Sequence, residues 1–400
     1  MKSLLYLSHR IPFPPNKGDK IRSYNLLARL AKNYRVYLAT FIDDKNDWQY
    51  TDVLREICED CLFVGLNPLF SRALSARGLI TGSSLTLPYY SNREMDSWVR
   101  ELVRDNKLDA AVAFSSSMAQ YLEPLHAASL PSVIDFCDVD SDKWLQYSEN
   151  KGFPMRWVYA REGGKLAAEE NQFHLESAAS VFISDDECDV FRDIATADAE
   201  KICTVKNGVD TDFFDPDAEL DNPFSDGEKA IVFVGAMDYW PNIDAVSWFA
   251  QDIFPAISRL HPDLRFYIVG SSPTDAVMKL EQDPNIKVTG RVDDVRAYLQ
   301  YAHCCVAPIR VARGVQNKVL EAMSMAKRTV ASAAAIEGIG SVDDLVPVES
   351  IEDWVEAIRA ALKSEKPERK DVYRQHVMDA FSWDASGAQL SALVENAISR

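Results

Sequence analysis

The chain has 400 residues, of which 61 are Asp or Glu and 43 are Lys or Arg, so its formal net charge at pH 7 is −18. Apolar residues make up 47% and charged residues 26%, a composition typical of a globular protein with room for two cores. The excess of acids excludes nonspecific binding to nucleic acid, which needs a broad basic face. No apolar run approaches the roughly 20 residues of a membrane span. Seven scattered cysteines are typical of reduced core thiols, so we expect a cytoplasmic protein.

Apolar runs typical of buried strands alternate with amphipathic stretches throughout the chain. In the first half we expect strands near residues 4–8, 36–41, 62–66, 110–114, 132–136, 181–184 and 202–206. The alternation predicts an α/β fold with parallel sheets covered by helices. A turn-rich loop after the first strand ends at Gly18 and opens a helix from about Asp19 to Ala31. Gly18 either lets the backbone approach a ligand at the edge of the sheet or merely permits a tight turn.

Three carboxylates, Asp135, Asp138 and Asp140, stand at the end of the apolar strand that begins near residue 132. An acid at the start of the long helix expected from about Lys143 through Ala179 would cap that helix. An acid that faces a cleft would instead accept a hydrogen bond from a substrate hydroxyl. We expect one of Asp138 and Asp140 to cap the helix and the other to face the cleft, and the sequence does not say which.

The second half of the chain begins a new series of strands. Residues 207–228 open with the Asn207-Gly208 turn signal and have no apolar period, so we interpret them as a linker between domains at 1–206 and 229–383. Further strands are expected near residues 230–235, 265–269, 286–289, 303–307, 329–332 and 346–348. The first of them ends on Gly235, as the first strand of a nucleotide-binding half does. Neither a P-loop nor a G-x-G-x-x-G motif after a strand is present.

A cluster of cations lies between the expected strand at 303–307 and the helix that follows it. Arg310, Arg313 and Lys318 precede the first acid, Glu321. A helix N-terminus with nearby cations suits a phosphate, and a carboxylate one turn further along suits a sugar hydroxyl. We interpret the segment as a site for a nucleotide-sugar diphosphate. The alternative is a solvated loop followed by an ordinary amphipathic helix.

Several short motifs, at their places in the two halves, resemble the retaining glycosyltransferases of family 4. They are the loop ending in Gly18, Asn207-Gly-Val-Asp210, Phe233-Val-Gly235, Gly290-Arg-Val-Asp293-Asp294, and Glu321-Ala-Met323 followed by Arg328-Thr-Val330. Three more stretches resemble bacterial exopolysaccharide sugar transferases of PEP-CTERM and exosortase loci: Ser8-His9-Arg10-Ile-Pro-Phe-Pro-Pro, Asp138-Val-Asp-Ser141 and Gly314-Val-Gln-Asn-Lys-Val-Leu-Glu321. The resemblance implies a GT-B fold, in which two Rossmann-like domains with parallel sheets face a central cleft. It implies an acceptor on the first domain, a donor on the second, and a C-terminal helix at 384–398 that completes the first.

The same resemblance implies roles for individual residues. Glu321 should bind the ribose hydroxyls of the donor, Gly18 should lie near its diphosphate, and Arg291 with Val292 should border its base. Further candidates are Gly235, Arg310 and Asn317 for the donor, and His9, Asp138 and Asp140 for the acceptor. The family commonly has a Glu where this chain has Arg313. We infer that Arg313 and Lys318 neutralise the leaving diphosphate, with Asp138 and Asp140 orienting the acceptor. We expect no cofactor and no metal, because no Asp-x-Asp element is placed to bridge Mg²⁺.

These observations predict transfer of a hexose-type sugar, with retention of configuration, from a nucleotide-sugar donor to a hydroxyl of a glycan or lipid-linked acceptor in exopolysaccharide biosynthesis. Two alternatives stay open. One is a nucleotide-sugar epimerase or phosphorylase of the same fold, and the other is a non-catalytic nucleotide-sugar- or glycan-binding member of an assembly complex. A lipid carrier would require peripheral contact with the inner face of the plasma membrane. Residues 66–77 are an apolar and basic candidate for that contact; the alternative is a short helix packed on the first domain.

Overall fold

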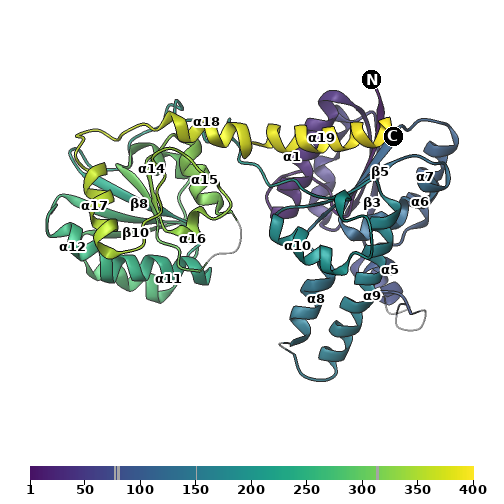
Figure 1. The fold of residues 1–400 in the computed structure, drawn as a ribbon, viewed down its shortest axis with the longest axis horizontal. Helices are drawn as coiled ribbons and strands as arrows, with labels where there is room; N and C mark the ends of the chain where they lie inside the picture. The colour runs from purple at the N-terminus through teal and green to yellow at the C-terminus, as the bar shows by residue number, and fades with distance from the viewer. Residues whose placement is uncertain (76–77, 79–81, 150, 312–314) are drawn as a thin grey trace. The chain divides into compact units, whose positions relative to one another are not determined.

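The computed structural model describes residues 1–75, 78, 82–149, 151–311 and 315–400 (Figure 1). The chain divides into two compact units, of which unit 1 contains residues 1–208 and 383–400 and unit 2 contains residues 209–382. The segment 207–228, which we expected to be a linker, belongs to unit 2 from residue 209 onwards. The reason is that Val209, Phe214 and Phe224 are buried in the hydrophobic clusters of that unit.

Unit 1 is built on a seven-stranded parallel sheet in the order β3-β2-β1-β4-β5-β6-β7. The strands are β1 (Ser3–Ser8), β2 (Arg35–Ile42), β3 (Asp60–Gly65), β4 (Ala110–Phe114), β5 (Ser132–Cys137), β6 (Ala179–Phe182) and β7 (Ile202–Thr204). The strand order reverses between β1 and β4. Loops that leave neighbouring strands in opposite directions open a crevice at the carboxyl edge of such a sheet, where ligands bind.

Helices cover both faces of this sheet, which is why its strands are continuous apolar runs. Leu4 and Tyr6 of β1 are buried in the same cluster as residues of α1 (Gly18–Asn33) and α19 (Trp383–Ser399). Leu5 and Leu7 are buried on the other face with residues of α6 (Arg93–Arg104). The other described helices of unit 1 are η1 (Lys45–Tyr50), α2 (Thr51–Ile57), α3 (Pro68–Ser75), α5 (Thr86–Tyr89), η2 (Ser116–Tyr121), α7 (Glu123–Ala127), α8 (Asp140–Glu149), α9 (Met155–Glu176), α10 (Asp185–Ile194) and η3 (Ala199–Lys201).

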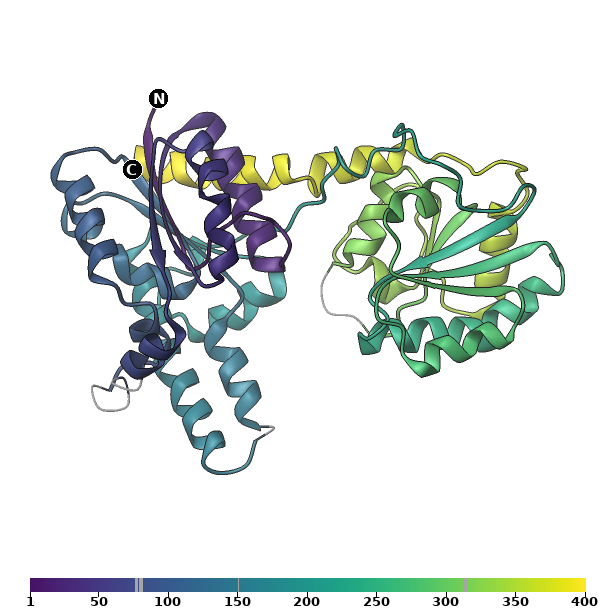
Figure 2. The ribbon, with the colours of Figure 1, turned by 180° about the vertical axis from the view of Figure 1, so that it is seen from behind.

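The single helix predicted from about Lys143 through Ala179 is wrong. The segment forms two helices, α8 and α9, which make a hairpin that projects from the body of unit 1 (Figures 1 and 2). Between them lies Lys151-Gly-Phe-Pro154, in which the glycine disfavours helix and the proline has no N–H to donate. A Cβ atom on Gly163 would lie 2.7 Å from Leu145 Cγ, so the glycine allows the two helices to pack closely.

Unit 2 is built on a five-stranded parallel sheet in the order β10-β9-β8-β11-β12. Its strands are β8 (Lys229–Val234), β9 (Leu264–Val269), β10 (Ile286–Gly290), β11 (Cys304–Ala307) and β12 (Thr329–Ala331). The order reverses between β8 and β11, so this sheet has its own switch point. The strand predicted at 346–348 does not form: Val346 is exposed, residue 347 is a proline, and Val348 N donates to Ala331 O at 2.9 Å without extending the sheet.

The described helices of unit 2 are α11 (Trp240–Trp248), η4 (Phe249–Ile253), α12 (Phe254–Ser258), α13 (Asp275–Met278), η5 (Lys279–Gln282), α14 (Val295–Tyr301), α15 (Asn317–Ser324), α16 (Ala333–Ile336), α17 (Ile351–Ala361) and α18 (Asp371–Ala380). Among the described parts of the whole chain, no helix combines the length and the apolar character needed to cross a membrane.

Candidate functional site

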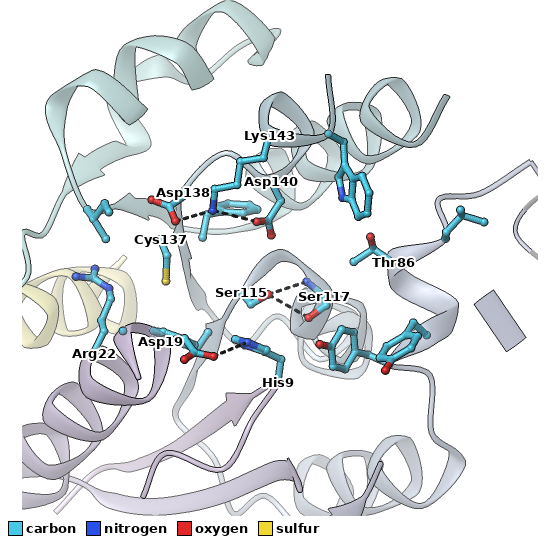
Figure 3. Close-up of a pocket in the computed structure, with 18 of the residues that line it drawn as sticks. His9, Asp19, Arg22, Thr86, Ser115, Ser117, Cys137, Asp138, Asp140 and Lys143 are labelled. Atoms are coloured by element: carbon cyan, nitrogen blue, oxygen red, sulfur yellow. Dashed lines mark hydrogen bonds and ion pairs between the residues drawn. The ribbon is translucent and has the colours of Figure 1, made fainter. Parts of the chain in front are cut away.

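A pocket of about 700 Å³ lies in unit 1, at the carboxyl edge of the sheet where β1 and β4 diverge (Figure 3). Its walls come from the loops after β1, β4 and β5, from the start of α1, and from α5 and α8. The polar side chains that line it include those of His9, Asp19, Arg22, Thr86, Ser115, Ser117, Asp138, Asp140, Lys143 and Asn207. The aromatic ones are those of Tyr89, Tyr90, Phe114, Phe136 and Trp144.

One side of the pocket carries a fixed anion, the carboxylate of Asp19. His9 Nε2 lies 3.5 Å from Asp19 Oδ2, and Arg10 Nη1 donates to the same oxygen at 2.5 Å. Burial acts to raise the pKa of Asp19, but the contact with His9 and the charge of Arg10 outweigh it and hold that pKa well below its usual range. The His9 ring stacks on Phe114, with 5.9 Å between ring centroids. The predicted acceptor residue His9 is therefore held between a ring and a carboxylate.

The opposite side carries Lys143 between two carboxylates (Figure 3). Lys143 Nζ donates to Asp138 Oδ2 at 2.6 Å and lies 3.6 Å from Asp140 Oδ1. Burial acts to lower the pKa of Lys143, but the two carboxylates outweigh it and raise that pKa. Asp140 is the first residue of α8 and also accepts a hydrogen bond from Ser116 Oγ at 2.8 Å. The either-or assignment we made from the sequence is wrong in one respect, since both Asp138 and Asp140 line the pocket.

Two strained residues lie at neighbouring strand ends in the pocket wall. Ser115, directly after β4, has φ 84°, and Cys137, the last residue of β5, has φ 67°. Residues other than glycine rarely adopt positive φ, and such strain concentrates where function requires it. The turn brings Ser115 Oγ to 3.1 Å from Ser117 Oγ. The sequence signal for these serines is their place directly after the buried strand β4.

A buried ion pair between α1 and β5 stabilises the pocket wall. Arg22 of α1 binds Asp135 of β5 through two hydrogen bonds, Nε to Oδ2 at 2.9 Å and Nη2 to Oδ1 at 3.1 Å. The same guanidinium donates to Asn207 Oδ1 at 2.9 Å. These bonds join α1 and β5 to the segment around Asn207, where the chain leaves unit 1 for unit 2. Asp135 is thus a structural residue, and Asn207, which the sequence singled out as a turn residue and as part of the Asn207-Gly-Val-Asp210 motif, lines the pocket.

Glu162 of α9 fixes the aromatic part of the pocket. Its buried carboxylate accepts hydrogen bonds from Leu85 N at 2.6 Å, Thr86 N at 3.0 Å and Thr86 Oγ1 at 2.7 Å. The first backbone N–H groups of a helix have no partner within the helix, so an acid at this position stabilises α5. Tyr89 ends α5 and Tyr90 follows it. The sequence alone could not reveal this contact, because the carboxylate and the helix that it caps lie 76 residues apart.

In unit 2, the predicted donor residues Lys318 and Glu321 lie on α15, after the loop that follows β11. Lys318 Nζ is 3.3 Å from Gln316 Oε1 and 5.7 Å from the centroid of the Phe233 ring. Burial lowers the pKa of Lys318, partly offset by the charge of Glu321, and burial raises the pKa of Glu321, partly offset by Lys318. Both charged forms are therefore poorly solvated. A bound anion would stabilise the ammonium form of Lys318.

The remaining predicted donor residues are more widely distributed. Arg310, which we considered as a further cation, is already paired with Asp244 of α11 through two hydrogen bonds, with Nε at 2.9 Å from Oδ2. Arg313 lies outside the described residues. Other predicted residues lie as follows: Asn317 is exposed at the start of α15, Arg291 is exposed after β10, Val292 is half-buried beside it, Gly235 follows β8, and Gly18 begins α1 and lines the pocket of unit 1.

Gly235 has a packing role as well as its predicted binding role. A Cβ atom at this position would lie 2.6 Å from Asn242 Nδ2, and the Asn242 amide donates to Ala236 O at 2.9 Å. The glycine therefore lets the loop after β8 pack against the first turn of α11. Among the residues that the structure describes, no group of three or more His, Cys, Asp or Glu side chains is arranged to hold a metal ion.

Comparison with solved structures defines the fold class. The chain is similar to a glycosyltransferase from Rickettsia africae ESF-5, with a TM-score of 0.64 and 14% identity over 99% of each chain. It is similar to Anabaena HepE in complex with UDP, with a TM-score of 0.60 and 14% identity over 99% of this chain and 100% of that one. A UDP-forming α,α-trehalose-phosphate synthase from Burkholderia xenovorans gives 0.58 and 12% over 99% of each. The likeness confirms the predicted GT-B fold.

A family comparison gives a match within unit 2. Residues 228–364 match the family model of glycosyl transferases group 1, and this range contains Gly235, Lys318 and Glu321. A search of curated proteins found no match. Unit 2 thus carries a group 1 glycosyltransferase domain, which confirms our prediction of a glycosyltransferase at that level.

Proposed function

We propose that the protein is a retaining glycosyltransferase of family 4, which transfers a hexose-type sugar from a nucleotide diphosphate to an acceptor hydroxyl in exopolysaccharide biosynthesis. The observation that carries the proposal is the group 1 glycosyltransferase match over residues 228–364, the range that holds Lys318 and Glu321. Among the similar structures, HepE is in complex with UDP and the Burkholderia synthase is UDP-forming. Uridine diphosphate sugars are therefore the first donors to test.

The donor would bind unit 2. Lys318, together with Arg313, would neutralise the diphosphate as it leaves, and Glu321 would accept hydrogen bonds from ribose hydroxyls. The barrier lies in separating an anionic leaving group from a sugar that gains positive charge, so a cation placed in advance lowers it. Partial burial strengthens this effect, because the field of Lys318 is poorly screened by water. In this mechanism the charge is balanced by side chains, without a metal.

The acceptor would bind the pocket of unit 1. Trp144, Tyr89 and Tyr90 offer apolar ring faces, and Asp138 and Asp140 offer oxygens that accept hydrogen bonds from hydroxyls. Lys143 already pairs with the two acids, and Arg22 is occupied by Asp135. Because the carboxylate of Asp19 adds further negative charge, the pocket favours a neutral, hydroxyl-rich acceptor over an anionic one. A glycan or a lipid-linked sugar fits this description.

The first test is calorimetric titration with UDP, GDP, ADP and their common sugar conjugates. We expect one nucleotide family to bind the wild type. Glu321→Ala should weaken that binding by about 1.5–3 kcal/mol, the range for a hydrogen bond to a charged group. The matched control is Glu356→Ala, which removes an exposed carboxylate from α17 of the same unit and should leave binding unchanged.

The results separate the proposed activity from its alternatives. If no nucleotide binds the wild type, the donor site does not exist and the proposal fails. If a nucleotide sugar binds but releases its nucleotide at the same rate with and without an added glycan acceptor, the protein is not a transferase. Release that depends on the acceptor, and that slows when Trp144 is replaced by Ala, would support the assignment of the acceptor pocket.

A further inference from the structure

The end of the α8–α9 hairpin exposes apolar side chains that nothing in the described chain covers. Tyr147 is 55% exposed, Phe153 87%, Met155 42% and Trp157 57%. We refer to these four residues, with Lys151 and Arg156, as the hairpin tip. Scattered exposed apolar residues are ordinary, but four large ones within eleven positions at the end of a projecting hairpin indicate an interaction surface.

A second exposed apolar surface lies on α3, where Leu69 is 77% and Phe70 is 64% exposed. Residues after α3 are hydrogen-bonded to the hairpin, since Arg161 of α9 donates to Gly78 O at 2.7 Å and to Ser83 O at 3.0 Å. Ser75 Oγ of α3 donates to Leu85 O at 2.7 Å, and Leu85 N donates to Glu162 Oε2 of α9 at 2.6 Å, so α3 is joined to the hairpin through the segment that leads into α5. The two surfaces therefore belong to one structural block.

The charge of this block differs from that of the rest of the chain. The protein has 61 acids against 43 basic residues, yet no Asp or Glu occurs from Leu66 to Arg93, and the hairpin stretch from Tyr147 to Arg161 holds one acid, Glu149, against three cations, Lys151, Arg156 and Arg161. Lys151 and Arg156 are exposed at the hairpin tip, and neither forms an ion pair with another described residue. Aromatic side chains beside unpaired cations match the interface of an anionic bilayer, where rings enter the headgroup region and cations meet phosphates.

We propose that the hairpin tip and α3 dock the protein on the surface of an anionic lipid bilayer. The net charge of −18 would repel most of the molecule from such a surface and so orient it with the basic, aromatic end towards the lipid. The same elements supply part of the acceptor pocket, through Ser75 of α3 and Trp144 of α8. Docking would therefore place a pocket wall beside lipid-linked sugars; this last step alone rests on the proposed function.

The test uses the full chain and vesicle flotation, without any nucleotide, so that its outcome is independent of donor binding. Vesicles are made of phosphatidylcholine alone or mixed with phosphatidylglycerol. The wild type should bind the mixed vesicles, and Phe153→Ser/Trp157→Ser should lower its partition coefficient at least about tenfold, because two exposed rings that would enter the lipid are lost. The control Leu260→Ser/Val346→Ser, which removes two exposed apolar side chains of unit 2, should bind as the wild type does.

Two further variants sharpen the result. Lys151→Gln/Arg156→Gln should reduce binding to the mixed vesicles by about fivefold per cation, with little change for phosphatidylcholine alone. Leu69→Ser/Phe70→Ser tests α3 separately, and remains informative if the hairpin variant fails to fold by circular dichroism. Failure of the wild type to float with mixed vesicles would overturn the proposal, as would equal flotation of the apolar variants. A wild-type dimer by light scattering that the hairpin variant converts to a monomer would make a second copy the occupant instead.

Discussion

Glu170, on α9, is a buried carboxyl group that contacts Ser141, the residue after Asp140 of the unit 1 pocket. Ser141 Oγ donates to its Oε2 at 2.5 Å, and no part of its side chain is exposed. Burial raises its pKa to about 8, the charge of Asp140 adds to the rise, and the bond from Ser141 partly opposes it. Near neutral pH the folded protein therefore keeps a proton that the unfolded chain releases. The free energy of unfolding of unit 1 therefore depends on pH.

The sign of this dependence follows from proton release. Between about pH 4.5 and 8 the unfolded state binds fewer protons at this position than the folded state, so rising pH lowers the free energy of unfolding. Glu170→Gln removes the ionisation. We expect the free energy of unfolding of the variant to rise relative to that of the wild type as pH rises through that window, by up to about 1.4 kcal/mol per pH unit. Urea denaturation at several pH values measures it, with the exposed Glu56→Gln as control; parallel curves for Glu170→Gln and the wild type would contradict the raised pKa.

At the scale of elements, strands were predictable where their apolar character is continuous. The strand expected at Ala110–Phe114 is β4 with the same bounds, because a parallel strand covered on both faces is apolar throughout. The α8–α9 hairpin was missed although Gly152 and Pro154 mark its turn. The helical pattern continues on both sides of these two helix-breaking residues, so we interpreted the whole segment as one helix.

The candidate site was predictable only in part, for a physical reason. Asp138, Asp140 and His9 follow apolar strands directly, and the carboxyl ends of neighbouring parallel strands meet at one edge of a sheet. Tyr89 and Trp144 reach the pocket from helices whose place depends on tertiary contacts, such as the hydrogen bonds that the start of α5 donates to Glu162. Likewise, nothing near Arg310 in the sequence reveals its partner Asp244, which is 66 residues away.

The close contact of α8 with α9 gives a prediction at this scale, with a control one residue away. In Gly163→Ala the added methyl would lie 2.7 Å from Leu145 Cγ and 2.9 Å from Ser141 O, so the helices must move apart. We expect a loss of about 1–3 kcal/mol in the free energy of unfolding of unit 1, the usual cost of overpacking. In Gly164→Ala the methyl would meet nothing within 4 Å, so this variant should gain about 0.5–1 kcal/mol from its better helix former. Urea denaturation compares the two, and equal effects would contradict the close packing.

At the scale of the whole molecule, the chain enters unit 1 twice. Residues 1–208 form its sheet, unit 2 follows, and α19 then adds the last helix to unit 1. Leu390 and Val394 of α19 are buried in the cluster that also holds Leu26 and Leu30 of α1. The N-terminal unit therefore cannot complete its core until the C-terminal helix has been synthesised, whereas unit 2 is continuous in sequence.

This arrangement predicts that a change near the C-terminus destabilises the N-terminal unit. Leu390→Ala should cost unit 1 about 2–5 kcal/mol, the range for removing a buried leucine side chain. Hydrogen exchange read by mass spectrometry assigns the loss, because amides of β1 and β4 should exchange faster while those of β8 and β9 do not change. Ile358→Ala, in the core of unit 2, should give the opposite pattern. If Leu390→Ala also accelerated exchange in β8 and β9 to the same degree, the two units would unfold as one, and α19 would stabilise the whole chain instead of unit 1 alone.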